Sequence, residues 1–331
     1  MEIFDYKNEE KESVPCNLCS GSDFAVLSRR SKNNLSARTV MCKDCSLVFI
    51  SPRMTKDGYD RYYKYHYRSH RALIKGNEPT LDQNFASALK FGRAWGKKYR
   101  QYLTGGLTID VGSSTGGLLA GLKEEISALT ALGIEPSLLE SEYANEKGIH
   151  TKSLLFEDFE DEVDEKAVNI FCVQSLNHLL DPSKFLKWAY DTLLPGGHIH
   201  LAVKNFRHQA RRAGFIEASI QIDHVYMFLP ETLKKMVEAA GFEVVSLDVD
   251  EKKSHEKIAR QKKDGFNIHH IRLVGKKRPD FSGPVTMRDR KLYLWTRLSL
   301  SPFMLKSYYL FWYSRFLLPV RKLLQLEGIR H

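Results

Sequence analysis

The sequence predicts an α/β fold built around a doubly wound, mostly parallel sheet, with a small cysteine-rich module before it and a basic, aromatic tail after it. Three observations favour this class. Apolar or β-branched runs alternate with helical segments between residues 107 and 203. A glycine-rich turn follows the first of these runs, as in sheets that bind ligands at the carboxyl ends of their strands. Four of the five cysteines form two Cys-x2-Cys pairs before residue 50.

The two cysteine pairs, Cys16 with Cys19 and Cys42 with Cys45, have the spacing of a four-thiolate metal site. Four thiolates complete a tetrahedral site whose usual occupant is zinc, and they leave no open position, so we expect the zinc to be structural. Two disulfides or a redox pair are the alternatives. The acidic N-terminus shows no secretory signal, which disfavours disulfides. Cys172 stands alone in an apolar run and is predicted to be a small buried side chain.

Residues 46–75 contain five tyrosines interleaved with basic residues. The simpler interpretation is a helix that packs its aromatic side chains onto the zinc module. The alternative is a lid that presents hydroxyl groups to a polar acceptor. Residues 81–104 then predict a helix, with Phe91 and Trp95 among its apolar positions.

The next segment predicts a strand that ends in Asp110, a tight turn from Gly112 to Gly117, and a helix from Leu118 onward. Glycines at positions 112 and 116 would let a ligand approach the backbone closely. No Gly-Lys-Ser/Thr triplet follows, so this turn is not the phosphate-binding loop of nucleotide hydrolases.

Four further strands complete the predicted sheet. The second, over 128–134, is followed by Glu135, whose carboxylate could accept the hydroxyl groups of a ribose. The other predictions are a third strand near 156–159, a fourth over 168–173, a helix over 183–193 and a fifth strand over 198–203. This alternation of strands and helices predicts the doubly wound sheet.

Five motifs follow one another along the chain: IDVGSSTG, GIEPS, SLNHLLDP, LLPGGHIHLAV and DHVYMFLPETLKKMVEAAGFEVV. In this order they resemble the class I S-adenosylmethionine-dependent methyltransferases, which implies a Rossmann-like methyltransferase sheet. With the four-cysteine module and the tyrosine-rich link, the chain is similar to bacterial sugar methyltransferases, including nucleotide-sugar C-methyltransferases. We therefore expect a zinc-binding module and link over 1–75, a methyltransferase domain over 76–250 and a basic C-terminal extension over 251–331.

The resemblance implies nine residues that bind S-adenosylmethionine: the first loop around its methionine part, an acid at its ribose, a pair beside its adenine and a pair near its sulfonium. In chain order these are Asp110, Gly112, Ser113, Gly116, Glu135, Asp158, Phe159, Gln174 and Ser175. Ser114 stands where many members have glycine. Acids flank the expected pocket and no basic residue lies in the glycine turn, which suits a sulfonium better than a pyrophosphate.

Methyl transfer from a sulfonium requires mainly alignment and removal of a proton from the acceptor. His224 and His178 are the candidate bases, because an imidazole can accept a proton at neutral pH. Asp223 could orient His224, and a similar acid–histidine pair lies beside the substrate in sugar C-methyltransferases, so His224 is ranked first. The alternative for each histidine is a hydrogen bond to the backbone at a strand end.

The expected reaction is methyl transfer to a small polar acceptor, a sugar or glycolipid intermediate of surface polysaccharide biosynthesis. About 80 residues follow residue 250, too few for the further α/β domain of sugar C-methyltransferases, so O-methylation is favoured. N-methylation and methylation of a secondary metabolite remain alternatives. So do an RNA methyltransferase, disfavoured because no Asn-Pro-Pro-Tyr-like loop follows the fourth strand, and a non-catalytic protein that binds the cofactor.

The net charge of +10 is concentrated at the C-terminal end. Residues 252–331 contain 19 Lys and Arg against 5 Asp and Glu, whereas residues 1–251 contain 31 against 35. The nearly neutral body makes nucleic acid an unlikely partner. A content of 43% hydrophobic and 27% charged residues excludes a disordered, collagen-like or polytopic membrane chain.

Aromatic and basic residues are interleaved over 288–326. This composition suits peripheral contact with an anionic membrane, and the alternatives are packing against the core or a second subunit, and binding of nucleic acid. Pro302 and Pro319 predict breaks into short helices. With no signal sequence and no apolar run of spanning length, we expect a cytoplasmic protein, peripheral on the inner face of the membrane if the tail binds lipid.

Overall fold

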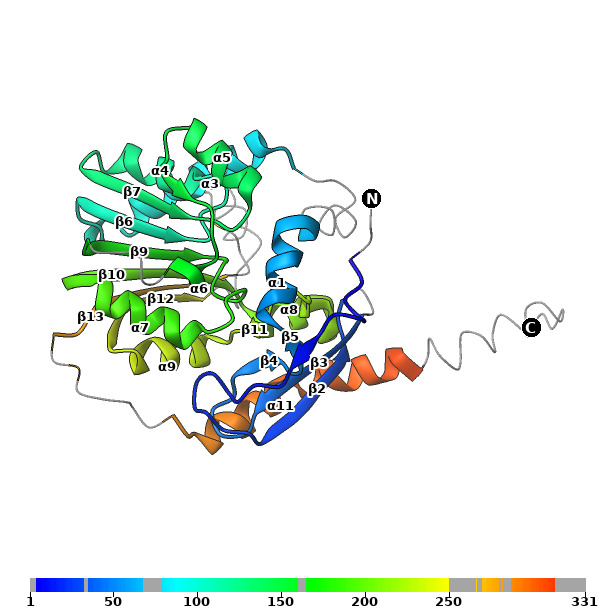
Figure 1. Cartoon of the computed structure of the whole chain (residues 1–331). Coiled ribbons are helices and arrows are strands. Elements are labelled where there is room, and N and C mark those ends of the chain that lie inside the picture. Colours follow the sequence, from blue (N-terminus) through cyan, green and yellow to red (C-terminus); the bar gives the residue numbers. More distant parts are fainter. Residues whose placement is uncertain are drawn as a thin grey trace, which may run out of the picture.

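The computed structural model describes residues 4–32, 35–67, 79–159, 165–249, 266, 270–279, 281 and 287–312. A seven-stranded sheet with helices on both faces lies beside a smaller N-terminal module, and α1 (Lys56–Arg61) lies near their junction (Figure 1). The predicted α/β class with a mixed, Rossmann-like sheet is confirmed.

The seven-stranded sheet has the order β12-β13-β10-β9-β6-β7-β8. In chain order its strands are β6 (Gly106–Val111), β7 (Leu129–Ile134), β8 (Thr151–Lys152), β9 (Ala167–Val173), β10 (Leu193–Lys204), β12 (Phe242–Val249) and β13 (His270–Lys277). The strands from β8 to β10 are parallel, whereas β13 runs antiparallel to both of its neighbours. The chain winds outward from β6 through β7 and β8 and then returns to β9. The direction of winding therefore reverses between β6 and β9, where such sheets bind ligands.

Alternating side chains of the central strands supply two separate cores. On β9, Ile170 and Cys172 point to one face of the sheet and Phe171 to the other, and all three are fully buried. Helices α7 (Pro182–Thr192) and α9 (Pro230–Ala239) cover the first face, and α3 (Leu81–Lys98) and α4 (Gly117–Glu125) cover the second. Among these, α3 confirms the helix predicted from residue 81.

The N-terminal module contains a four-stranded antiparallel sheet of order β11-β4-β3-β2. Three of its strands are local to the module: β2 (Phe24–Arg30), β3 (Ser36–Cys42) and β4 (Val48–Ile50). The fourth, β11 (Tyr226–Met227), comes from the chain after β10. A short pair, β1 (Lys11–Glu12) with β5 (Arg53–Met54), completes the module. The module is therefore joined to the methyltransferase region by strand pairing as well as by the link.

Two sequence predictions about the sheet require correction. The third strand is β8, whereas Phe156–Phe159 form a single helical turn, α6. The apolar residues Phe156 and Phe159 that suggested a strand are buried at the two ends of this turn. The sheet also continues beyond residue 250, because β13 inserts between β10 and β12. This strand of the expected C-terminal extension thus belongs to the methyltransferase sheet.

The other described part of the extension is α11 (Arg290–Trp312), which packs with α8 (Phe206–Ala213) and the four-stranded sheet. The helix passes through Pro302 without the predicted break. Proline removes the N–H that would bond to the carbonyl of Leu298, but the Ser301 hydroxyl donates to that carbonyl at 2.8 Å. Pro319 lies outside the described residues. No helix among the described residues is long and apolar enough to cross a membrane.

Candidate active site

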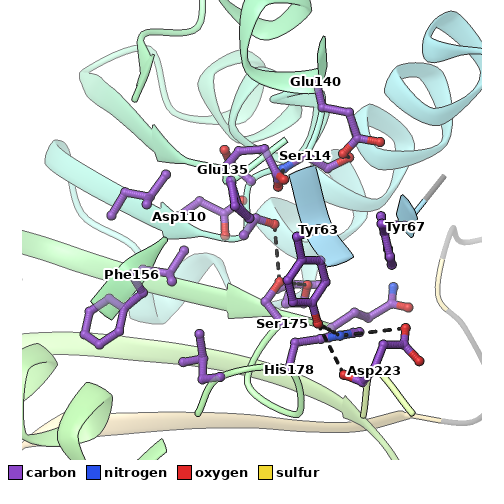
Figure 2. Close-up of a pocket in the computed structure, with 18 of the residues that line it drawn as sticks. Tyr63, Tyr67, Asp110, Ser114, Glu135, Glu140, Phe156, Ser175, His178 and Asp223 are labelled. Atoms are coloured by element: carbon purple, nitrogen blue, oxygen red, sulfur yellow. Dashed lines mark hydrogen bonds and ion pairs between the residues drawn. The ribbon is translucent and has the colours of Figure 1, made fainter. Parts of the chain in front are cut away.

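The turn after β6 forms one wall of a cavity of about 630 Å³ (Figure 2). Gly112 has a φ of 78°, and a Cβ atom there would lie 2.1 Å from the Ser175 Oγ, so a side chain does not fit. The backbone N–H groups of Gly112 and Ser113 donate to the carbonyl of Ile134 at 2.8 and 3.0 Å. These bonds fix the turn against β7 and hold space open at the carboxyl end of β6.

Three carboxylates line this side of the cavity: Asp110, Glu135 and Glu140. Backbone N–H groups of Ser137 and Ser114 donate to the two oxygens of Glu135 at 2.9 and 2.8 Å. The Ser114 hydroxyl donates to Glu140 at 2.9 Å. By contrast, the buried Oδ1 of Asp110 has no hydrogen-bond partner among the described residues. An orphaned buried acceptor at this position indicates a missing donor, such as a bound ligand.

The acids on this wall are poorly solvated. Burial raises the pKa of Asp110 to about 7. Burial and then the negative charge of Glu140 raise the pKa of Glu135 to about 8. A cationic ligand would favour the ionised forms of both. Because S-adenosylmethionine carries a positively charged sulfur and an amino group, the acids and the orphaned oxygen fit this cofactor. We call this wall the cofactor half of the cavity.

The opposite end of the cavity, the acceptor half, gathers side chains from three distant segments (Figure 2). The Tyr63 hydroxyl lies in the π-helical turn Tyr62–His66, within hydrogen-bond distance (2.9 Å) of His178 Nδ1 and 3.3 Å from the carbonyl of Asp223, to which it donates. The Asp223 carboxylate lies 3.9 Å from His178 Nδ1 and 4.0 Å from His224 Nε2. The two imidazoles meet edge to face at 4.7 Å. A carboxylate between two imidazoles is suited to accept and hold a proton.

Lys204, the last residue of β10, faces this cluster. Its Nζ lies 3.4 Å from His224 Nε2, and no other lysine or arginine belongs to the described cavity lining. The ligand atoms of His178, Asp223 and His224 lie within 4.8 Å of one another, a spacing that a metal ion could use. Because an ammonium group already faces the cluster, we interpret it as a site of proton transfer.

Most of the site residues predicted from the sequence line this one cavity. They are Asp110, Gly112, Ser113, Glu135, Gln174, Ser175, His178, Asp223 and His224. Three do not line it. Gly116, with a φ of 76°, begins α4; Asp158 pairs with a lysine of α1; and Phe159 is buried. The helical turn α6 explains the last two, because it directs Phe156 and Glu157 to the cavity in their place.

Other cavity residues were not singled out from the sequence. Tyr63 was covered only by the general hypothesis of a lid bearing hydroxyl groups. Glu140 and Lys204 were not predicted. Lys204 could have been found, since it is the first polar residue after the fifth strand, and the carboxyl ends of parallel strands meet at one edge of the sheet. Glu140 follows Glu135 by five positions, but only the fold of the intervening turn brings it to Ser114.

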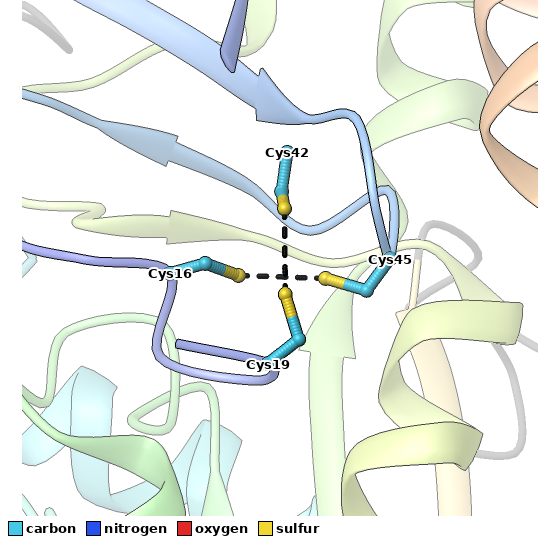
Figure 3. Close-up of side chains that lie close together, drawn as sticks. All are labelled: Cys16, Cys19, Cys42 and Cys45. Atoms are coloured by element: carbon cyan, nitrogen blue, oxygen red, sulfur yellow. Dashed lines mark hydrogen bonds between the residues drawn. The ribbon is translucent and has the colours of Figure 1, made fainter. Parts of the chain in front are cut away.

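The four paired cysteines converge at one point of the N-terminal module (Figure 3). Their Sγ atoms all lie within 4.8 Å of one another, with Cys16 to Cys45 at 3.4 Å and Cys19 to Cys42 at 3.5 Å. Tetrahedral zinc with Zn–S bonds of about 2.3 Å would require sulfurs about 3.8 Å apart. All four are free thiols. The donor set and its geometry therefore fit a tetrahedral metal site.

The two Cys-x2-Cys turns have equivalent backbones. In the first, Ser20 N–H donates to the Cys16 carbonyl at 2.8 Å, and in the second, Ser46 N–H donates to the Cys42 carbonyl at 3.0 Å. Both serines have positive φ, 57° and 68°. A further bond in each turn joins the first cysteine N–H to the carbonyl five residues later. Such matched turns present two thiolates each toward a common centre.

The module also holds the segments that carry the acceptor half. Asn17, inside the first cysteine turn, donates from its Nδ2 to Asp181 at 2.7 Å, just after the His178 loop. Arg53 donates to the carbonyl of Leu180 at 2.6 Å. The Tyr59 hydroxyl donates to the carbonyl of Ile222 at 3.1 Å, directly before Asp223. Both catalytic segments are thus fixed from the module side.

Comparisons with known proteins agree with this geometry. Residues 91–247 match the family model described as a methyltransferase domain. A comparison with curated protein sequences gives no match. Among solved structures, the plantazolicin methyltransferase BpumL in complex with SAH has a TM-score of 0.49 at 13% identity, covering 66% of this chain and 94% of that one.

Two other similar structures bear related descriptions. An S-adenosylmethionine-dependent methyltransferase from Archaeoglobus fulgidus has a TM-score of 0.47 at 16% identity, covering 64% of this chain and 100% of that one. The magnesium protoporphyrin IX methyltransferase of Synechocystis PCC 6803, with bound SAM, has a TM-score of 0.44 at 11% identity, covering 66% and 95%. The family match includes β6, β7, β9 and β10 and the cofactor half. The protein therefore contains a class I S-adenosylmethionine-dependent methyltransferase domain and is a methyltransferase.

Proposed function

We propose that the protein transfers the methyl group of S-adenosylmethionine to a hydroxyl group of a sugar, in a nucleotide-linked or lipid-linked intermediate of surface polysaccharide biosynthesis. The observation that carries this proposal is the acceptor half, where Tyr63, His178, Asp223, His224 and Lys204 converge on one end of the cavity. These side chains offer both donors and acceptors of hydrogen bonds. A polyhydroxylated acceptor can use both kinds, whereas a purely apolar acceptor would leave them unpaired.

In this proposal the bound cofactor supplies an electrophilic methyl group on a good leaving group. The chain's own residues then align the acceptor and remove its proton. His224 or His178 accepts the proton, and the Asp223 carboxylate stabilises the imidazolium that forms. The Lys204 ammonium stabilises negative charge that develops on the acceptor oxygen. Tyr63 holds His178 in position through its hydroxyl.

We also propose that the four-cysteine cluster holds zinc in a structural role. Its support is the convergence of four thiols in two equivalent turns. A four-thiolate site leaves no position for a substrate, so the ion would stabilise the module and not take part in the reaction. Through Asn17 and the strand pairing with β11, that stability extends to the acceptor half.

A methyl-transfer assay tests the proposal with nucleotide-linked and lipid-linked sugars as acceptors. We expect His224→Gln and His178→Gln to lower kcat, the base by about 100-fold or more, with unchanged affinity for the cofactor. His150→Gln changes an exposed histidine outside the cavity and serves as the matched control. Transfer to RNA or to a secondary metabolite with no transfer to any sugar would contradict the acceptor class. Cofactor binding without any transfer would contradict catalysis itself.

A further inference from the structure

The helix α11 has two chemically different long faces. On one face Tyr293, Thr296, Leu300 and Ser307 recur at helical spacing and are buried. They pack with the apolar residues of the four-stranded sheet and of α8, and the Ser307 hydroxyl accepts a hydrogen bond from the Ile216 N–H at 3.0 Å. This face fixes the helix to the body of the protein.

The opposite face exposes large apolar side chains. They are Leu294, Trp295, Leu298, Leu305, Tyr308 and Tyr309, each between 60% and 75% exposed. Their spacing places them along one side of a helix of 23 residues, which is about 34 Å long. Figure 1 shows α11 against the four-stranded sheet, with its C-terminal turns extending past that sheet. Half of the large hydrophobic residues that the described structure exposes lie on this one helix.

The charges around this face are nearly all positive. From Arg288 to Trp312 the sequence contains five basic residues and one acidic residue, Asp289, which is paired with Lys235. The next acidic residue along the chain is Glu327. The adjoining helix α8 adds two exposed arginines, Arg211 and Arg212. The Arg207 guanidinium lies 5.2 Å from the Trp295 ring centre, which helps to hold the indole in place at the surface.

We infer that the exposed face of α11 is a docking surface for an anionic lipid bilayer, on which the protein lies without spanning it. Aromatic and leucine side chains bordered by lysine and arginine are the composition that partitions into the headgroup region. Each basic residue near an anionic surface adds attraction that salt weakens. The helix is anchored through its buried face, so the protein would present this surface without rearrangement. This surface is distinct from the active site and does not depend on the acceptor proposed above.

Sedimentation of the full-length protein with vesicles tests the inference. We expect binding to vesicles of phosphatidylcholine and phosphatidylglycerol in equal amounts, and much weaker binding to phosphatidylcholine alone or at high salt. Trp295→Ser with Leu298→Ser should lower the partition coefficient by about tenfold or more, because two large apolar groups no longer enter the interface. Arg290→Glu with Lys291→Glu should lower it by a similar factor on anionic vesicles only.

The matched control is Leu138→Ser with Leu139→Ser, which removes two exposed leucines of α5 (Leu138–Glu146) that have no basic residues around them in the sequence. These substitutions should leave sedimentation unchanged. Binding that is equal for the α11 variants and the native protein would overturn the inference. So would a native protein that ignores anionic vesicles but forms a dimer that Trp295→Ser with Leu298→Ser dissociates, since a second copy would then cover this face.

Discussion

The two halves of the active-site cavity are built in different ways. The cofactor half comes mostly from one strand–turn–helix unit and the strand after it, between Asp110 and Glu140. The acceptor half combines a tyrosine before residue 67, the loop after β9, the end of β10 and the segment before β11. The first half depends on local sequence, whereas the second depends on how the N-terminal module docks onto the sheet. The two halves should therefore fail separately when the molecule is perturbed.

The largest expected effect comes from disrupting the four-cysteine cluster, by Cys42→Ser or by chelation. Loss of a structural metal removes folding energy from the module, and with it the contacts that fix His178 and Asp223. Turnover should fall by at least about 100-fold while the affinity for S-adenosylmethionine, measured by calorimetry, changes by less than about threefold.

Cys172→Ala is the control for this experiment, because Cys172 is a buried thiol of β9 outside the cluster. It should retain the metal content of the native protein. If turnover and cofactor affinity fell together in Cys42→Ser, the two halves would not be independent. If neither fell, the module would not position the acceptor half.

The second prediction concerns the cofactor half alone. In Gly112→Ala the new methyl group would lie 2.1 Å from Ser175 Oγ, which forces the turn and the end of β9 apart. We expect cofactor affinity to fall by about 30-fold, equivalent to about 2 kcal/mol. Gly196→Ala has the same kind of backbone, with a φ of 79°, but its methyl group would meet nothing within 4 Å. Gly196→Ala should therefore show the backbone strain without the loss of affinity.

A partial rescue would sharpen this result. Adding Ser175→Gly to Gly112→Ala removes the atom that the new methyl group meets. Affinity should recover by several-fold, because only the cost of a positive φ in alanine remains, about 1 kcal/mol. Absence of any recovery would mean that the clash with Ser175 is not the reason that glycine occupies this position.

The same contrast explains how far the sequence alone could predict the structure. Asp110, Gly112 and Glu135 lie in a contiguous strand–turn–helix pattern, so their common location followed from the order of the strands. The short α6 misled prediction, because Phe156 and Phe159 alternate with acids as in a strand but are buried at the ends of one helical turn. Local periodicity over four residues does not separate these cases.

The acceptor half was only partly predictable. Asp223 and His224 were proposed from their adjacency and from a family resemblance, and their distance to His178 required the fold. The role of the module was not predictable from spacing, because β11 consists of two residues that pair with β4 across a separation of more than 170 positions. Likewise, Pro302 did not break α11, because the hydroxyl of Ser301 compensates the missing N–H.

The third prediction tests one connection between the module and the acceptor half. Arg53 is buried, donates to the Leu180 carbonyl at 2.6 Å and to the Tyr226 hydroxyl at 3.2 Å, and pairs with Glu12. Arg53→Met keeps the length of the side chain and removes these bonds. We expect kcat/KM for the acceptor to fall about tenfold, since each lost charged hydrogen bond costs about 1–3 kcal/mol. Cofactor affinity should remain within about twofold, as measured by calorimetry.

A surface ion pair supplies the control for Arg53→Met. Arg93 pairs with Glu124 on the outside of α3 and α4, where both side chains are nearly half exposed. Arg93→Met should change neither kinetic constant, because an exposed pair contributes little. A loss of cofactor affinity in Arg53→Met equal to its loss of acceptor kinetics would contradict the separation of the two halves.

The smallest effect is a pH dependence confined to the cofactor half. The pKa of Asp110, raised to about 7 by burial, means that this group favours the folded, ligand-free protein below its ordinary pKa near 4. That contribution to stability is lost as the pH rises through 7. A cationic cofactor reverses the preference, because it binds the ionised carboxylate more tightly. Affinity should therefore increase about fivefold from pH 6 to pH 7 through Asp110 alone, with release of protons on binding.

Calorimetry in buffers of different ionisation enthalpy measures both quantities. Glu135, with a pKa raised to about 8, should extend the increase in affinity above pH 7. Asp110→Asn should remove the part of the pH dependence below pH 7, whatever its effect on the absolute affinity, because the amide does not titrate. If affinity in the native protein did not change between pH 6 and pH 8, these acids would not face the positive charge of the cofactor. The electrostatic account of the cofactor half would then be wrong, while the acceptor half would stand on its own geometry.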